Sequence, residues 1–137
     1  NEVEKLAQNL FICPSTIAQH AAVAAFSPAA REIMESQREA LRARRDFLLP
    51  ALRELGFSIP REPDGAFYIY AGIPEGFSEC ETFTNSLLEQ HHVAITPGTD
   101  FGNHLANRHI RFTYTTEMDR LRDAIDRLAR AMQTSEF

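Results

Sequence analysis

Apolar residues recur every three to four positions in the first part of the chain, a spacing that predicts helices with one apolar face. Two short helices are expected, at residues 3–10 and 16–26. Pro14 interrupts the pattern between them, and Ser15 is a favourable N-cap residue for the second helix. The second segment is rich in alanine, which predicts a helix that can pack closely against a neighbour.

A third and much longer helix is expected over residues 27–56. Ser27 is suited to the N-cap, and Pro28 to the first helical position, where the missing N–H costs nothing. Gly56 is the kind of residue that ends a helix. Pro50 lies inside the segment, so we expect a kink or break near it.

After Gly56 the helical period gives way to alternation, which predicts strands. They are expected at residues 57–60, 66–70, 93–96 and 109–115. Ser78 and Glu81 form a predicted capping box for a helix that runs to about His91, and Thr116 is expected to cap a last helix. The residues expected to face inward are Phe83, Leu87, Leu88, Met118, Leu121, Ile125, Leu128 and Met132. The order β-β-α-β-β-α predicts an α+β two-layer sandwich: a small, mainly antiparallel sheet with helices on one face.

Composition and charge narrow the possible partners. The 137 residues, 44% of them hydrophobic, are enough for one real core. The longest apolar run is residues 21–26, far short of a membrane span of ~20 residues. The net charge is −5 with the basic residues spread along the chain, so nucleic acid and anionic membranes are not expected partners. The chain begins without Met or a signal-peptide pattern, and we expect a piece of a longer cytoplasmic protein.

Candidate chemistry centres on one arginine. In the strand 109–115, apolar residues alternate with Arg111, Thr113 and Thr115, so these three are expected on the face away from the core. The planar guanidinium of Arg111 suits a carboxylate or phosphate; the alternative is a solvent-facing arginine paired with an acid.

Lys5, the single lysine among the 14 basic residues, lies among polar residues of the first helix. The histidines and cysteines have no metal-binding spacing, and neither a nucleophile motif nor a phosphate-binding loop appears.

Five stretches, taken in order, resemble the C-terminal part of the class I/II pyridoxal-phosphate-dependent aminotransferases of fold type I. They are QHAAVAA (19–25), the segment from RRD to LGF (44–57), PDGAFY (63–68), VAITPGTDFG (93–102) and IRFTY (110–114). The resemblance implies that residues 1–26 end the large cofactor-binding domain and that residues 27–56 form a connecting helix. Residues 57–137 are then the small C-terminal domain.

The resemblance also implies roles for two residues. Arg111 would bind the substrate α-carboxylate, and Phe67 would line the pocket, with core packing as the alternative for Phe67. The cofactor would be pyridoxal 5′-phosphate in the full-length parent, with an amino acid and a 2-oxo acid as substrates and a homodimer as the assembly. The family's lysine motif is absent here. We therefore expect no catalytic, cofactor-binding or metal-binding residue in this chain, and no activity from the chain alone.

Other functions stay open at this stage. The same scaffold serves carbon–sulfur β-lyases and oxoamine synthases, and these residues do not separate them from an aminotransferase. Some transcriptional regulators carry an aminotransferase-like domain that senses ligands. A bare α+β binding module with a coincidental likeness is the third alternative. The preferred amino acid cannot be deduced, because Arg111 would contact only the carboxylate common to all of them.

Overall fold

The computed structural model describes residues 1–134, which fall into two compact units that meet within one helix. The first unit, residues 1–39, holds helix α1 (Glu2–Leu10), helix α2 (Thr16–Ala25) and the start of α3 (Pro28–Glu54). The Asn1 side chain caps α1, and Ser15 Oγ accepts a hydrogen bond from the Ala18 N–H at 3.3 Å to cap α2. Both short helices and the Ser15 cap are confirmed.

The long helix α3 continues past Pro50 to Glu54, so the expected break there does not occur. Leu49 and Leu52 flank the proline and are both buried, and their packing outweighs the backbone hydrogen bond that proline cannot donate. The helix ends at Glu54, and Gly56 follows it as the expected terminating glycine, with a φ of +88° that favours glycine. The second compact unit begins at residue 40 and takes in the C-terminal half of α3.

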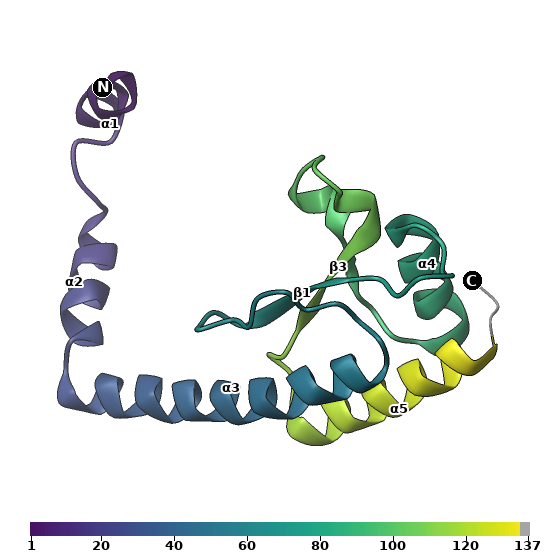
Figure 1. The fold of residues 1–137 in the computed structure, drawn as a ribbon. Coiled ribbons are helices and arrows are strands. Elements are labelled where there is room, and N and C mark those ends of the chain that lie inside the picture. Colours follow the sequence, from purple (N-terminus) through teal and green to yellow (C-terminus); the bar gives the residue numbers. More distant parts are fainter. Residues whose placement is uncertain (135–137) are drawn as a thin grey trace. The chain divides into compact units, whose positions relative to one another are not determined.

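The sheet of the second unit has three antiparallel strands, drawn in Figure 1. They are β1 (Tyr68–Gly72), β2 (Thr96–Pro97) and β3 (His109–Thr113), in the spatial order β1-β3-β2. In the register, Ile69 pairs with Phe112, while Arg111 pairs with Tyr70 on one side and Thr96 on the other. The central strand therefore carries Arg111 between two neighbours on the same face.

All four strand predictions need correction, although the strand expected at 109–115 differs only in ending early, at Thr113. Residues 57–60 form only one isolated bridge, between Ser58 and Gly72. The strand expected at 66–70 starts two residues later, because Ala66 has a φ of +63°, which breaks the extended backbone. The strand expected at 93–96 shrinks to Thr96–Pro97, because the Val93 N–H bonds back to the Leu87 carbonyl at the end of the preceding helix.

Helices α4 (Cys80–His91) and α5 (Met118–Thr134) complete the second unit. The predicted capping box of α4 is wrong: Glu79 is the N-cap and makes no side-chain cap, while the Glu81 carboxylate accepts from the Thr99 hydroxyl. The predicted cap of α5 is also wrong. That helix begins at Met118, and the carbonyl that accepts from the Leu121 N–H belongs to Glu117 rather than to Thr116.

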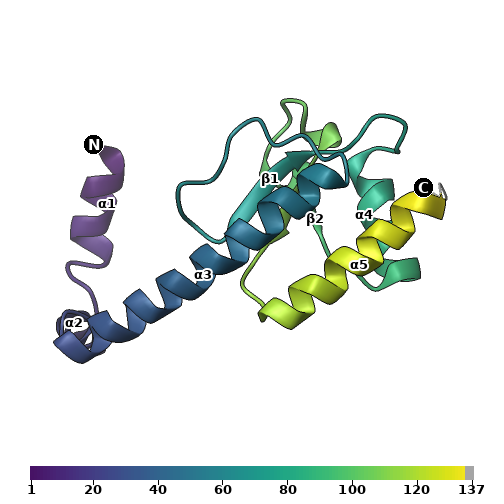
Figure 2. The ribbon, with the colours of Figure 1, turned by 60° about the horizontal axis from the view of Figure 1, so that its bottom comes forward.

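The core lies between the sheet and the three helices, which cover one of its faces (Figure 2). Phe57 contacts Phe112 edge-on, with ring centroids 5.2 Å apart, and joins α3 to the sheet. The fully buried side chains include Leu52, Ile69, Phe83, Leu87, Ile110 and Leu128. Leu88, expected inward, is half exposed, and Met118 is only partly buried. The α+β class with helices on one face is confirmed.

Arg108 holds the loop that leads from β1 into α4. Its guanidinium donates to the carbonyls of Phe77 and Pro74 at 2.9 and 3.1 Å, and also to those of Ser78 and Ile73. One side chain thus satisfies four carbonyls of a segment without regular structure. The Ile73 N–H donates in return to the Arg108 carbonyl.

We therefore expect Arg108→Ala to lower the free energy of unfolding by about 2 kcal/mol, since hydrogen bonds from a charged donor are the stronger kind. Urea denaturation would measure the change. Arg127→Ala is the matched control, because Arg127 pairs with Asp123 on the surface of α5, and such a pair contributes about 0.5 kcal/mol. Equal losses in the two variants would contradict the role given to Arg108.

Candidate functional site

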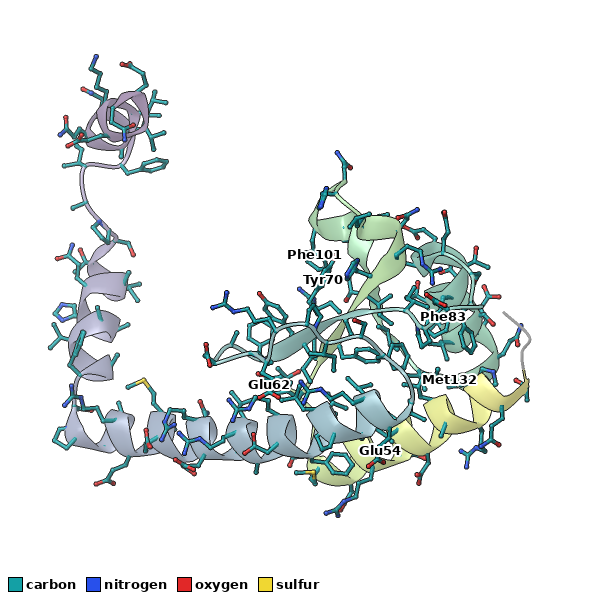
Figure 3. All side chains as sticks on the ribbon, in the orientation of Figure 1. Glu54, Glu62, Tyr70, Phe83, Phe101 and Met132 are labelled. Carbon is teal, nitrogen blue, oxygen red and sulfur yellow. The ribbon has the colours of Figure 1, made fainter. Side chains whose placement is uncertain are left out.

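Arg111 lies on the face of the sheet opposite to the helices. Its neighbours Ile110 and Phe112 are buried in the core, so the predicted alternation along this strand is confirmed. Tyr70 on β1 and Thr96 on β2 stand directly opposite Arg111 on the same face. In Figure 3, Tyr70 and Phe101 lie together on the side of the sheet away from α3 and α5.

Two aromatic rings lie close to the guanidinium of Arg111. Its central carbon lies 4.5 Å from the ring centroid of Phe101 and 5.6 Å from that of Tyr68. Nη2 donates to the Thr96 hydroxyl at 3.5 Å, the long limit of a hydrogen bond. Nε is buried and has no hydrogen-bond partner. Within residues 1–134 no carboxylate pairs with Arg111, so the alternative of an arginine neutralised by a nearby acid does not apply.

A guanidinium held in this way can bind an anion. Both rings lie within cation–π distance of the guanidinium. The N–H donors lie in the plane, at the edge, where a carboxylate or phosphate can accept two parallel hydrogen bonds. A pocket lined by Tyr68, Tyr70 and the loop 60–64 adjoins this face and could hold the rest of a ligand.

A 3-10 turn (Gly98–Phe101) follows β2 directly and borders the site. A side chain at Gly98 would have its Cβ 2.5 Å from the His109 carbonyl oxygen and 2.8 Å from the Tyr70 hydroxyl. Only glycine fits such a close approach. The turn is therefore packed tightly on β3 and β1, which sets the position of Phe101 at its end.

Tyr70 and His109 form a stacked pair beside Arg111, with ring centroids 5.1 Å apart and planes within 2° of parallel. Burial raises the pKa of the Tyr70 hydroxyl, with a smaller contribution from Cys80, so the hydroxyl keeps its proton at neutral pH. His109 Nδ1 lies 2.8 Å from the Leu105 carbonyl, an acceptor, so this nitrogen carries a proton. The Tyr70 hydroxyl is therefore a donor on this face, while the Nδ1 proton of His109 is used by the Leu105 carbonyl.

Phe67, the other residue expected at the site, lies just before β1 and is 45% exposed. Its ring contacts that of Tyr68 edge-on at 5.6 Å. The alternative in which Phe67 packs in the core is therefore wrong. Phe67 is thus in contact with Tyr68, whose ring is also a neighbour of the Arg111 guanidinium.

Sequence reasoning missed Tyr68, Tyr70, Thr96 and Phe101. Tyr68 and Tyr70 carried a usable signal, because they alternate with buried residues along the strand and so share the face of Arg111. No comparable pattern in the sequence places Phe101 at the site, since it lies in a turn whose position depends on the packing of Gly98 against distant residues.

The described residues offer no buried lysine to the cofactor that the resemblance implies. Lys5 lies on α1, pairs with Glu2 at 3.3 Å and has a side chain 69% exposed, so it points into no pocket.

In the part of the chain that the structure describes, no group of three His, Cys, Asp or Glu side chains could hold a metal ion. No helix among those same residues is both long and apolar enough to cross a membrane.

Comparisons with known proteins agree with the fold and the motifs. The family model for aminotransferases of class I and II matches residues 1–128. An aspartate aminotransferase of Bacillus subtilis is 36% identical over 126 residues, which cover 88% of this chain and 31% of that protein. An aspartate/prephenate aminotransferase of Thermus thermophilus is 40% identical over 121 residues, covering 87% of this chain and 30% of that protein.

The structural match is of the same kind. The crystal structure of an aminotransferase from Mycobacterium tuberculosis superposes with a TM-score of 0.85 at 33% identity, covering 96% of this chain and 34% of that one. The chain thus spans about a third of the length of the relatives that it matches. On this evidence the chain belongs to the class I and II aminotransferase family.

Proposed function

We propose that this chain is the C-terminal part of a longer pyridoxal-phosphate-dependent aminotransferase, in which Arg111 binds the α-carboxylate of the amino acid and of the 2-oxo acid. The observation that supports this most is the guanidinium on the central strand, bordered by aromatic rings and paired with no acid of the described residues. Residues 1–26 would end the large domain, 27–56 connect the domains, and 57–137 form the small domain.

The role of Arg111 in this proposal is binding and orientation. Two hydrogen bonds to a carboxylate fix both the position and the plane of that group, which a single point charge cannot do. A fixed carboxylate limits rotation of the substrate, and such positioning lowers the barrier of the later chemistry. The names of three matched relatives refer to aspartate, to prephenate, and to valine with pyruvate. These compounds differ in the rest of the molecule but share a carboxylate.

Phe67 would border the substrate through its contact with Tyr68. The cofactor supplies the chemistry of amino-group transfer, and its lysine would come from outside these 137 residues. The isolated chain is therefore expected to be inactive. The longer protein is proposed to be a cytoplasmic homodimer.

The test compares this chain with the longer protein after addition of pyridoxal phosphate. We expect the visible absorption band of lysine-bound cofactor in the longer protein only, together with transfer of an amino group from an amino acid to a 2-oxo acid. Lys5→Arg in the chain is the control. A borohydride-reducible band in the chain that this substitution abolishes would contradict the proposal. A longer protein that binds amino acids without transferring the amino group would favour the ligand-sensing alternative.

A further inference from the structure

Arg111 has few contacts that could hold its guanidinium in one place. The side chain has several rotatable bonds, and the one hydrogen bond that it makes within residues 1–134, to Thr96, is at the long limit of 3.5 Å. Of the two rings over the guanidinium, that of Phe101 is the nearer: its centroid lies 4.5 Å from the central guanidinium carbon, against 5.6 Å for Tyr68. Phe101 is therefore the aromatic residue best placed to restrict the cation.

We propose that Phe101 is a positioning residue for Arg111: its ring holds the guanidinium by the face and leaves the edge free for the substrate carboxylate. This inference rests on the proposed function of Arg111. An acid in place of the ring would hold the guanidinium too, but it would occupy the edge donors and compete with the substrate. A ring restricts the cation without using those donors.

Phe101 is itself held in place from two sides. Its ring meets that of Tyr70 edge-on, at 6.4 Å and 88° between the planes. The turn that carries it begins at Gly98, which packs directly on the His109 and Ala106 carbonyls. Thr99, in the same turn, donates its hydroxyl to the Glu81 carboxylate on α4. The turn is thus fastened to the sheet and to a helix, although Phe101 is 50% exposed.

The exposure of Phe101 separates a positioning role from a structural one. A half-exposed ring at the end of a turn contributes little to the core, so its truncation is expected to leave stability almost unchanged. The truncation would instead leave the Arg111 guanidinium less well positioned, and this would weaken binding of the carboxylate. Both substrates carry that group, so KM for the amino acid and for the 2-oxo acid would rise by the same factor.

The experiment uses the longer protein, loaded with pyridoxal phosphate. Phe101→Leu keeps an apolar side chain and removes the ring, and is expected to raise both KM values about 3- to 30-fold, the range of a cation–π contact. The value of kcat is expected to change less than KM does, because the contact with the carboxylate is present in the bound substrate as well as in the transition state. Phe101→Tyr keeps the ring and is expected to retain the parent KM. Leu88→Ala is the matched control, since Leu88 is 51% exposed and lies on α4.

A double variant shows whether Phe101 acts through Arg111. In an Arg111→Gln background the cation is gone, so Phe101→Leu is expected to add almost nothing to the rise in KM. Equal KM values for Phe101→Leu and the parent would overturn the inference. A fall in melting temperature and in kcat, not rescued by Phe101→Tyr, would overturn it as well. A parent protein without transfer activity would instead refute the proposed function itself.

Discussion

Replacement of Arg111 by lysine in the longer protein is expected to lower kcat/KM for amino acids about 100-fold. Truncating one partner of a hydrogen-bonded charge pair costs about 2–5 kcal/mol, and about 1.4 kcal/mol corresponds to a factor of ten. Lysine keeps the charge but has one ammonium group in place of the planar fork, so it cannot form the paired hydrogen bonds. Steady-state kinetics with an amino acid and with a 2-oxo acid would measure the loss.

Stability is expected to change little in this variant, because Arg111 is only partly buried and forms one long hydrogen bond. Arg122→Lys is a suitable control. Arg122 also lies over an aromatic ring, 5.9 Å from the centroid of Phe47, but it projects from α5 and pairs with Asp119 on the surface. A kcat/KM for Arg111→Lys within about twofold of the parent would show that Arg111 does not bind the carboxylate.

The position of Arg111 could be deduced from the sequence because it depends on a local rule. Side chains alternate along a strand, and the burial of Ile110 and Phe112 turns Arg111 to the other face wherever the strand lies. The helices were predictable for a similar reason. Ser15 and Gly56 act on the backbone next to them, so their effect does not depend on the rest of the fold.

The failed predictions depend on contacts between distant segments. Ser78 has the residue type of an N-cap, but Arg108 holds its carbonyl and those of its neighbours, and α4 begins later. Pro50 suits the end of a helix, yet the burial of Leu49 and Leu52 carries α3 past it. Phe101 belongs to the same class. Nothing within a few residues indicates that its ring will meet Arg111, because the packing of Gly98 places the turn.

Gly98 is therefore the position where a single methyl group should do the most damage to the fold. In Gly98→Ala the new Cβ would lie 2.5 Å from the His109 carbonyl oxygen, 2.8 Å from the Tyr70 hydroxyl, and closer still to the Ala106 carbonyl. Two of these three atoms are backbone, which cannot turn away as a side chain can. We expect the free energy of unfolding to fall by about 3–4 kcal/mol, at the upper end of overpacking effects.

Two further variants make this prediction specific. Gly65→Ala is the control, because no atom lies within 4 Å of a Cβ built there, and its unfolding free energy is expected to stay within about 0.5 kcal/mol of the parent value. Tyr70→Phe combined with Gly98→Ala removes the hydroxyl contact alone. We expect it to recover little stability, since the two carbonyls remain.

Gly98→Ala is also expected to weaken substrate binding at the site. Any shift of the turn that relieves the clash at Gly98 moves Phe101, at the other end of the turn, away from the guanidinium. In the longer protein, Gly98→Ala is therefore expected to raise KM at least as much as Phe101→Leu does, in addition to its effect on stability. If Gly98→Ala unfolded at the same urea concentration as Gly65→Ala, the turn would have to be free to move, and it could not be what holds Phe101 against Arg111.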